Sequence, residues 1–289
     1  MRSGKCGEVS RRSFIKLGVT GLAAAGATSP LGLHGRPAAG ARKPIGLQLY
    51  SVRFDCEKDL PGTIAAAAKM GYQGVEFAGY YKRSARELRK MLDDNGLKCC
   101  GTHIGLDTLI GNGLPATVEF NKMLGNEFLI VPGLSEERTL SRKAWLETAR
   151  LFNNIAGKLK PEGMRAGYHN HSIEFKPLDG EMPWDTFFLN TSKDVVMQID
   201  VGNALEGGAD PVPFIRKYPG RAATVHVKEY SKSNPKAYVG EGDVKWKEVL
   251  ALLEKIGGTQ WYIVEYEAEG MPPLESVKRC LENLHKMGM

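Results

Sequence analysis

Eight segments with the composition of β-strands recur along this chain, and a helix-like segment follows each of them. The strand-like segments occupy residues 44–52, 72–79, 97–105, 127–133, 164–171, 195–203, 222–230 and 260–267. The helix-like segments occupy residues 59–71, 84–96, 114–125, 141–159, 183–191, 210–219, 244–257 and 273–288. Strands that alternate with helices indicate a parallel sheet, and eight such units predict that the sheet closes into a barrel.

The predicted fold class is therefore α/β, a (β/α)8 TIM barrel that forms a single domain over residues 42–289. The 289 residues suit a barrel of roughly 250 residues that follows a short N-terminal segment. An open doubly wound sheet is the alternative. That fold usually carries a glycine-rich phosphate-binding turn after its first strand, and residues 47–53 (LQLYSVR) contain no glycine.

Residues 1–41 have the composition of an export signal. The string SRRSFIK (10–16) contains Arg11 and Arg12, a short and weakly apolar run follows it, and Ala39-Gly40-Ala41 forms a small-residue cleavage site. The string resembles the twin-arginine (Tat) signal of bacteria, which implies export of an already folded protein to the periplasm or beyond. We expect cleavage after Ala41; a disordered basic tail is the alternative. The apolar run is too short and too rich in glycine to span a bilayer.

Most of the chain's positive charge lies in this segment. Residues 1–41 contain six basic residues and one acid, so the formal charge of +6 falls to about +1 for residues 42–289. A nearly neutral domain does not suit a phosphate backbone, and no nucleic-acid partner is predicted. The remaining cysteines, Cys56, Cys99, Cys100 and Cys280, have the spacing of neither a disulfide framework nor a zinc site.

Polar side chains gather at the predicted C-terminal ends of the strands, where the active sites of such barrels lie. They are Glu76, His103, His169, His171, Asp200, His226, Lys228, Glu265 and Glu267. Residues two apart on a strand share a face, so His169 and His171 are expected to point the same way. The same holds for His226 with Lys228, and for Glu265 with Glu267.

Imidazole and carboxylate groups from separate strands suit a divalent metal ion. Asp200, His226 and Glu265 are predicted to form the centre of such a site, with one Mn²⁺, Co²⁺, Zn²⁺ or Mg²⁺ ion as cofactor. The structural alternative is that each is a hydrogen-bonded polar residue of the barrel rim.

An ordered set of motifs resembles the xylose isomerase-like barrels of sugar phosphate isomerases and epimerases, to which inosose dehydratase and the ketose 3-epimerases belong. The motifs are VEF (75–77), THIG (102–105), YHNHSIEF (168–175), QIDVGNA (198–204), VHVKEY (225–230), VGEGDV (239–244) and IVEYE (263–267). The resemblance covers residues 44–287. It implies that Asp200, His226 and Glu265 bind the metal ion with one further ligand from the fifth strand.

The fifth strand departs from the epimerase pattern. Many relatives have Glu-Asn-His where this chain has His169-Asn170-His171. We predict that His169 is the fourth ligand; Glu174, which would have to reach back from just beyond the strand, is the alternative. A metal-bound histidine is a poorer base than the glutamate it replaces. Proton transfer is therefore assigned to Glu174, His171 and Lys228 together with Glu265.

A metal-bound sugar carbonyl has an acidified neighbouring C–H, and removal of that proton gives an enediolate. Its reprotonation is epimerisation or isomerisation, whereas loss of a β-substituent is dehydration or glycoside elimination. We predict a metal-dependent isomerase or epimerase of a small carbohydrate, and a dehydratase or lyase of a keto-sugar or 3-keto-glycoside is the alternative. Glu76, His103 and Tyr50 are predicted to bind substrate.

The substrate is expected to carry no phosphate, because sugar phosphates are cytoplasmic and no cluster of basic residues appears near the strand ends. Three other functions stay open: an apurinic endonuclease, a non-catalytic sugar-binding barrel, and a non-catalytic partner of an oxidoreductase. A homo-oligomer is compatible with the sequence, and no membrane span is predicted.

Overall fold

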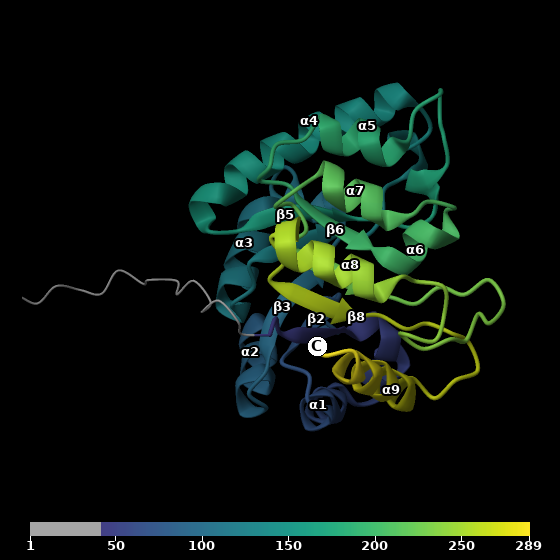
Figure 1. The fold of residues 1–289 in the computed structure, drawn as a ribbon. Helices are drawn as coiled ribbons and strands as arrows, with labels where there is room; N and C mark the ends of the chain where they lie inside the picture. The colour runs from purple at the N-terminus through teal and green to yellow at the C-terminus, as the bar shows by residue number, and fades with distance from the viewer. Residues whose placement is uncertain (1–41) are drawn as a thin grey trace, which may run out of the picture. The chain divides into compact units, whose positions relative to one another are not determined.

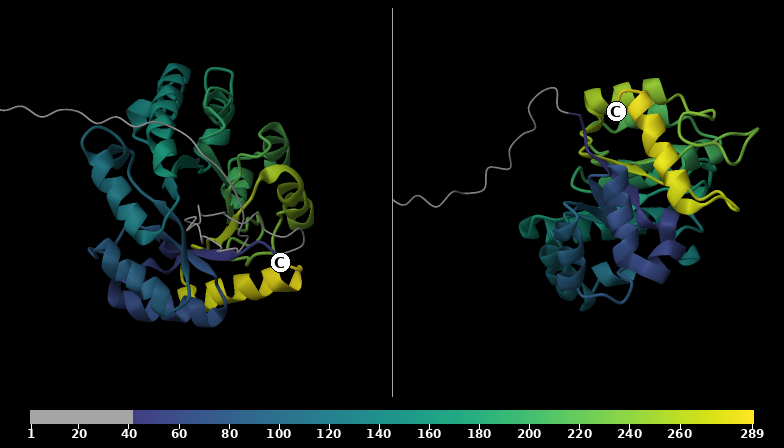
Figure 2. Two further views of the ribbon diagram at one scale, coloured as in Figure 1. Left: turned by 90° about the vertical axis from the view of Figure 1, so that its left-hand side faces the viewer. Right: turned by 90° about the horizontal axis from the view of Figure 1, so that it is seen from below.

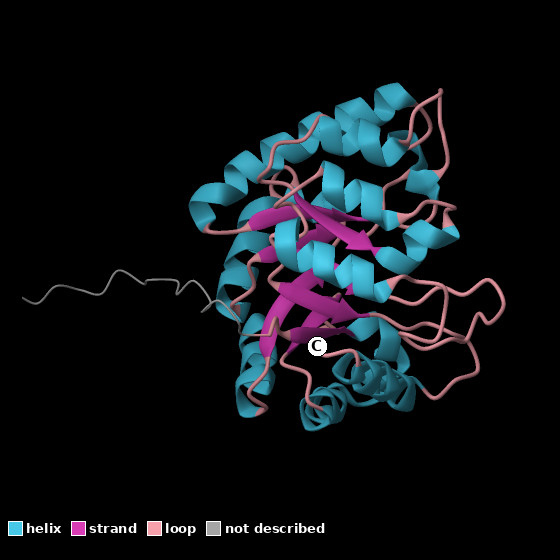
Figure 3. Cartoon of the chain, in the orientation of Figure 1, coloured by secondary structure: helices cyan, strands magenta, loops and turns pink. Residues whose placement is uncertain are grey.

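The computed structural model describes residues 42–289, and the predicted export signal of residues 1–41 lies outside them. The described part contains eight strands, all parallel to their neighbours (Figures 1 and 3). They are β1 Ile45–Gln48, β2 Gly74–Ala78, β3 Lys98–His103, β4 Phe128–Val131, β5 Arg165–His169, β6 Val196–Asp200, β7 Thr224–Val227 and β8 Trp261–Val264. Each strand pairs with the next in sequence, and β8 pairs with β1. The prediction of a closed eight-stranded barrel is confirmed.

The helices surround the strands, as the two views in Figure 2 show. They are α1 Arg53–Met70, α2 Ala85–Asp94, α3 Gly113–Leu124, α4 Arg142–Leu159, α5 Pro183–Leu189, α6 Val201–Glu206, α7 Pro211–Lys217, α8 Trp246–Leu252 and α9 Pro273–Lys286. Short 3-10 segments lie in the connections, among them η1 Leu49–Val52 before α1 and η5 Ile173–Phe175 after β5, and the π-helical turn Leu253–Gly257 continues α8. Each predicted helical segment overlaps one of these helices, and α6 lies outside all of the predicted segments.

Local signals in the sequence explain where several helices begin. Ser84 and Glu87 form a reciprocal capping box at the start of α2, each side chain accepting from the other's backbone N–H. Ser141 caps α4 by accepting from the N–H of Ala144 at 3.2 Å. Both helices have strongly segregated apolar faces, which pack their buried residues against the barrel.

The sixth strand ends at Asp200, as its predicted strand-end position requires, although the strand-like segment continues to residue 203. The chain turns at Asp200, and residues 201–203 form the first turn of α6. The side chain of Asp200 accepts from the N–H of Asn203 at 2.7 Å and so starts the helix. An apolar Val201 after the strand concealed this helix start in the sequence.

The space between β5 and helices α4 and α5 is filled by aromatic rings. Tyr168 of β5 contacts Trp145 and Phe152 of α4 and Phe187 of α5, with ring centroids 5.2–6.1 Å apart. All four side chains are buried. Truncation of one such ring to alanine typically costs about 3–5 kcal/mol of folding free energy. This packing fixes the strand that carries His169.

The longest connection between a strand and the following helix comes after β7, and together with the shorter connection after β8 it projects beyond the arrowheads of the strands at the right of Figure 1. The segment between β7 and α8 spans residues 228–245, and that between β8 and α9 spans residues 265–272. Both therefore border the C-terminal mouth of the barrel. In residues 42–289, no helix has the length and apolar character needed to cross a membrane.

Candidate metal centre and active site

Four buried side chains converge at the C-terminal end of the barrel. His169, Asp200 and His226 come from β5, β6 and β7, and Glu265 directly follows β8. One potential ligand atom from each lies within 4.8 Å of those of the other three. These are the four residues that the sequence predicts as metal ligands. The structure brings them together, and their binding of an ion stays a prediction.

Three polar atoms of this cluster are buried without a hydrogen-bond partner among the described residues: Nδ1 of His169, Oδ2 of Asp200 and Nδ1 of His226. Nδ1 of His226 lies 2.7 Å from Oε2 of Glu265, without the alignment of a hydrogen bond, and 3.7 Å from Oδ2 of Asp200. A buried polar atom that lacks a partner is costly, and such atoms are rare in native proteins. A cation bound among them would satisfy all three, so the donor set fits a divalent metal ion.

The hydrogen bonds that hold Asp200 leave one of its carboxylate oxygens without a partner. Its Oδ1 accepts from the N–H of Asn203, which leaves Oδ2 for another partner. Asn170 accepts from the N–H of Asp200 at 2.8 Å and donates to its carbonyl at 3.0 Å. A β carbon on Gly202 would lie 2.8 Å from the carbonyl oxygen of Lys228, so the close packing of α6 on the segment after β7 requires glycine there.

A network of hydrogen bonds lies within the barrel beside His226. Its ring Nε2 is 2.6 Å from Oε2 of Glu76, which also accepts from Nε2 of Gln48 at 2.7 Å. The other oxygen of Glu76 accepts from Nε2 of Gln198 at 2.8 Å. Glu76, Gln48 and Gln198 are fully buried. The prediction that Glu76 binds substrate is untested, and this burial favours a role in support of the site.

A β-bulge makes room for the carboxylate of Glu76. The pairing of β2 with β3 shifts after Val75, so that Cys99 faces Val75 and Gly101 faces Glu76, with Cys100 as the additional residue. A β carbon on Gly101 would collide with Oε1 of Glu76. Position 101 is therefore restricted to glycine by a side chain on the neighbouring strand.

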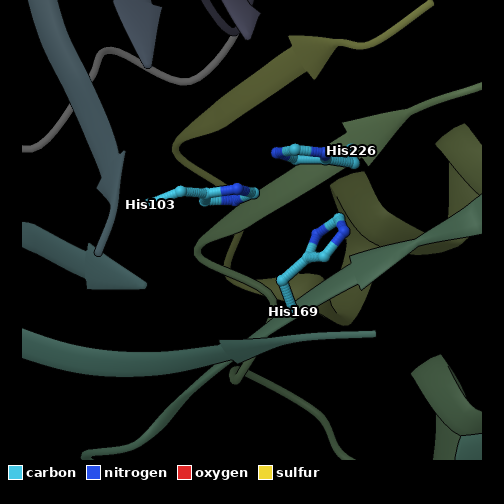
Figure 4. A group of neighbouring side chains, drawn as sticks. All are labelled: His103, His169 and His226. Carbon is cyan, nitrogen blue, oxygen red and sulfur yellow. The ribbon is translucent and has the colours of Figure 1, made fainter. Parts of the chain in front are cut away.

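His103, at the end of β3, joins His169 and His226 in a second group of candidate ligands (Figure 4). The rings of His103 and His226 are stacked, with an interplanar angle of 9° and centroids 5.2 Å apart. Nε2 of His103 is 2.7 Å from Oε1 of Gln198. The side chain of His103 is 10% exposed, and its role in substrate binding remains a prediction.

The three fifth-strand candidates occupy different environments. His169 ends β5 and is buried, whereas His171 lies beyond the strand and is exposed, with its ring 5.2 Å from that of His169. Glu174 is buried in η5, where Oε1 accepts from the hydroxyl of Tyr168 at 2.5 Å and Oε2 from the N–H of His171 at 2.9 Å. Both oxygens of Glu174 are thus used within the chain, and Glu174 is absent from the candidate metal groups of the described residues.

Lys228 links the cluster to the residues that face the mouth. Its Nζ donates to Oε1 of Glu265 at 3.0 Å and to Oε2 of Glu267 at 3.3 Å. Lys228 follows β7, and both glutamates follow β8, so the three side chains extend beyond the strand ends. Sequence periodicity indicated that Lys228 shares a face with His226 and that Glu265 shares one with Glu267, but Glu267 carried no assigned role.

Burial and neighbouring charges change the acidity of these groups. Burial raises the pKa of Asp200 to about 7 and that of Glu267 to about 6, where the charge of Glu265 adds to the effect.

The two buried histidines shift in opposite directions. For His226, burial alone would lower the pKa, but the carboxylates of Glu76 and Glu265 raise it to about 10. Burial lowers the pKa of His169 well below its usual range. His169 is therefore neutral and able to act as a ligand.

A cavity of about 510 Å³ opens beside the cluster at the mouth. Lys228 and Glu267 line it, as do Asn203, Glu206 and Tyr230. Its charged side chains are Lys228, Lys232, Glu206, Glu229 and Glu267, and no arginine is among the described lining residues. Such a wall offers hydrogen bonds to hydroxyl groups without an excess of positive charge.

Tyr50 lies outside both the cluster and the lining of this cavity. Its side chain is 46% exposed in η1, and the guanidinium of Arg53 lies 4.3 Å from its ring centroid. The sequence analysis missed the supporting amides, namely Gln48, Asn170, Gln198 and Asn203. A usable signal was present for Gln198, because it stands two residues before Asp200 on the same strand face.

The comparisons with known proteins agree with the barrel fold. The chain belongs to the xylose isomerase-like TIM barrel family, whose model matches residues 64–287. A sugar phosphate isomerase/epimerase from Parabacteroides distasonis is 27% identical with a TM-score of 0.71, over 86% of this chain and 95% of that structure. The resemblance inferred from the sequence is confirmed.

Two curated relatives are more distant in sequence. The rhizopine catabolism protein MocC of Rhizobium meliloti is 23% identical over 75% of this chain and 78% of its own length. Inosose dehydratase of Klebsiella pneumoniae is 23% identical over 71% of this chain and 82% of its own length. The family thus includes isomerases or epimerases as well as dehydratases.

Proposed function

We propose that the protein is a divalent-metal-dependent isomerase or epimerase of an unphosphorylated sugar or keto-sugar. The observation that carries this proposal is the set of three partnerless buried atoms in the cluster of His169, Asp200, His226 and Glu265. A divalent ion bound there would polarise a sugar carbonyl as a Lewis acid and acidify the neighbouring C–H. The comparisons support the family, and the metal and the reaction are our inference.

The charged residues at the mouth supply proton transfer and charge stabilisation. Lys228 stands where it can donate to an enediolate oxygen, because its ammonium group reaches the cavity from beside Glu265. Glu267 lines the same cavity and has a pKa of about 6, which suits a group that takes and returns a proton near neutral pH. His171, exposed beside His169, is a second candidate.

Glu174 has a positioning role in this proposal. Its carboxylate holds the turn after β5 through Tyr168 and the N–H of His171, and it is not free to contact a sugar. Glu265, held by Lys228 and adjacent to His226, serves as a ligand. The substrate is unphosphorylated in this proposal because the three glutamates of the cavity wall outnumber its two lysines.

The test uses the purified protein with and without added Mn²⁺, Co²⁺ or Zn²⁺. It is incubated in D₂O with a panel of neutral ketoses and keto-sugars. Metal-dependent incorporation of deuterium next to the carbonyl, read by NMR, is the expected result, and the product identifies isomerisation or epimerisation. Failure to bind any of the three ions would overturn the proposal.

Dehydration is the second candidate function, and the likeness to inosose dehydratase favours it. The same enediolate would lose a β-hydroxyl group with a proton from Glu267 or His171, giving an unsaturated ketone and water. Ultraviolet absorbance of the conjugated product separates the two outcomes, because isomerisation and epimerisation produce no such chromophore.

A further inference from the structure

The carboxylate of Glu76 is surrounded by hydrogen-bond donors. Oε2 lies 2.7 Å from Nε2 of Gln48 and 2.6 Å from Nε2 of His226, and Oε1 lies 2.8 Å from Nε2 of Gln198. An ionised carboxylate can only accept hydrogen bonds. The nitrogen of His226 that faces Glu76 must therefore carry a proton.

The ionised carboxylate of Glu76 also determines, through the orientation of the Gln198 amide, which nitrogen of His103 carries a proton. The amide nitrogen of Gln198 donates to Glu76 and to the hydroxyl of Thr224, at 2.8 and 2.9 Å. Its oxygen consequently faces Nε2 of His103 at 2.7 Å and needs a donor there. His103 therefore carries its proton on Nε2.

We propose that Glu76 is a positioning residue that fixes the tautomers of His226 and His103 from within the barrel. With the proton of neutral His226 on Nε2, its Nδ1 lone pair is presented toward Asp200 and Glu265, where a cation would bind. Metal-bound histidines commonly donate their second N–H to a carboxylate in this way. The statements about the cation and about the neutral form of His226 depend on the proposed function, because His226 carries a proton on both ring nitrogens until a cation displaces one. The statement about the tautomer of His103 does not depend on it.

The proposal predicts a specific change in the variant Glu76→Gln, because the glutamine side chain replaces one acceptor oxygen with an NH₂ donor. Gln48 cannot rotate to accommodate it without losing the hydrogen bond from the N–H of Tyr50 to its Oε1, at 3.0 Å. The new amide nitrogen must then face Gln198, whose own amide has to turn over. Nε2 of His103 would meet an NH₂ group and must become an acceptor, so its proton moves to Nδ1. The longer approach of Nε2 to Oε2 of Glu76, 3.3 Å, lacks the alignment of a hydrogen bond and does not hold the proton in place.

The first experiment is ¹H–¹⁵N NMR of the full chain labelled with ¹⁵N-histidine and loaded with Zn²⁺. In the wild type, His103 and His226 are expected as Nε2–H tautomers. In Glu76→Gln, His226 keeps its tautomer and His103 changes to Nδ1–H. An unchanged tautomer of His103 in this variant would overturn the proposal, and so would a wild-type His103 protonated on Nδ1.

The second experiment measures Zn²⁺ affinity by competition with a chelator. Glu76→Ala is expected to bind Zn²⁺ about 10–100-fold more weakly, as is typical when the partner of a metal-bound histidine is removed. Thr224→Val is the matched control, since it removes a fully buried hydrogen bond to Gln198 without touching Glu76 or either histidine. Its affinity is expected to equal that of the wild type.

The outcomes separate this inference from the proposed function. If Glu76→Ala and the wild type both bind Zn²⁺ with the same affinity, the positioning role of Glu76 is contradicted. The proposed metal centre is not affected by that result. A wild type that binds no ion contradicts the proposed function, and the tautomer of His103 in unloaded protein still tests Glu76. If Glu76→Ala does not fold, the nearly isosteric Glu76→Gln provides the decisive measurement.

Discussion

Asn170 holds Asp200 by both of its backbone polar groups, with hydrogen bonds of 2.8 Å from the N–H and 3.0 Å to the carbonyl. The amide lies between His169 and His171 in sequence and connects the end of β5 to the end of β6. Two of the four candidate ligands are therefore placed relative to each other by one side chain.

This relationship predicts that Asn170→Ala loses metal affinity as well as stability. We expect the free energy of unfolding to fall by about 1–3 kcal/mol, because two buried backbone groups lose their partner. Metal affinity should fall about tenfold or more. Asn126 offers a matched control, since it clamps the N–H and carbonyl of Phe128 in the same way at the start of β4. Asn126→Ala should be similarly unstable but bind metal normally; equal losses of affinity would contradict the assignment.

The fifth-strand ligand is resolved by two substitutions. His169→Ala should lose bound metal in elemental analysis by mass spectrometry, because Nδ1 of His169 is one of the three partnerless atoms. Glu174→Gln should retain about one equivalent, since both oxygens of Glu174 already have partners. The reverse pattern would assign the ligand to Glu174.

Metal uptake should release protons, and more of them at lower pH. Before a cation binds, Asp200 has a pKa of about 7 and His226 a pKa of about 10. Both raised values favour the protonated forms, so protons must leave as the cation enters. Affinity should therefore rise with pH. Calorimetry in buffers of different ionisation enthalpy should find about two protons released at pH 6 and about one at pH 8. Affinity that is independent of pH across this range would exclude both residues as ligands.

Glu229 is predicted to shape the cavity wall without affecting the metal. Its carboxylate accepts from the backbone N–H groups of Tyr230, Gly240 and Val244 and from the indole N–H of Trp246, at 2.7–3.2 Å. Glu229→Ala should therefore loosen residues 230–244, raise KM for the substrate and shift the fluorescence of Trp246, with metal content unchanged. An unaltered KM would show that this segment does not contact substrate.

Asp200→Asn should stabilise the protein in the absence of metal. The pKa of Asp200 is raised from 3.8 to about 7, so its contribution to stability is complete below pH 3.8 and is lost as the pH rises through 7. Asparagine keeps the N-cap of α6 and carries no charge. Its Tm without metal should exceed that of the wild type at pH 8 and approach it at pH 5. Added metal should raise the Tm of the wild type alone.

Much of the fold was predictable because strand and helix periodicities are local. All eight strands and the order of the helices follow from them, and so do the strand-end positions of His103, His169 and Asp200. The start of α6 and the bulge at Cys100 were not predicted. The first depends on the carboxylate of Asp200 and the second on the side chain of Glu76 from another strand.

The supporting network was also hidden from sequence analysis. Gln48, Asn170 and Gln198 are neutral amides within or beside apolar strands, and nothing in their spacing shows which partners they meet. Glu76 was assigned to the strand end, whereas it lies within β2 and is fully buried. Its environment depends on the register of β2 with β3, which a single sequence does not specify.

The three partnerless atoms of the candidate metal centre also affect how well the protein resists proteolysis. If the cluster binds an ion, a molecule that lacks the ion keeps unsatisfied polar atoms where β5, β6 and β7 end, close to the segments after β7 and β8. Local opening there costs less free energy than in the loaded protein. Proteases that cut open segments would then remove unloaded molecules first, so metal acquisition would act as a quality-control step for this barrel.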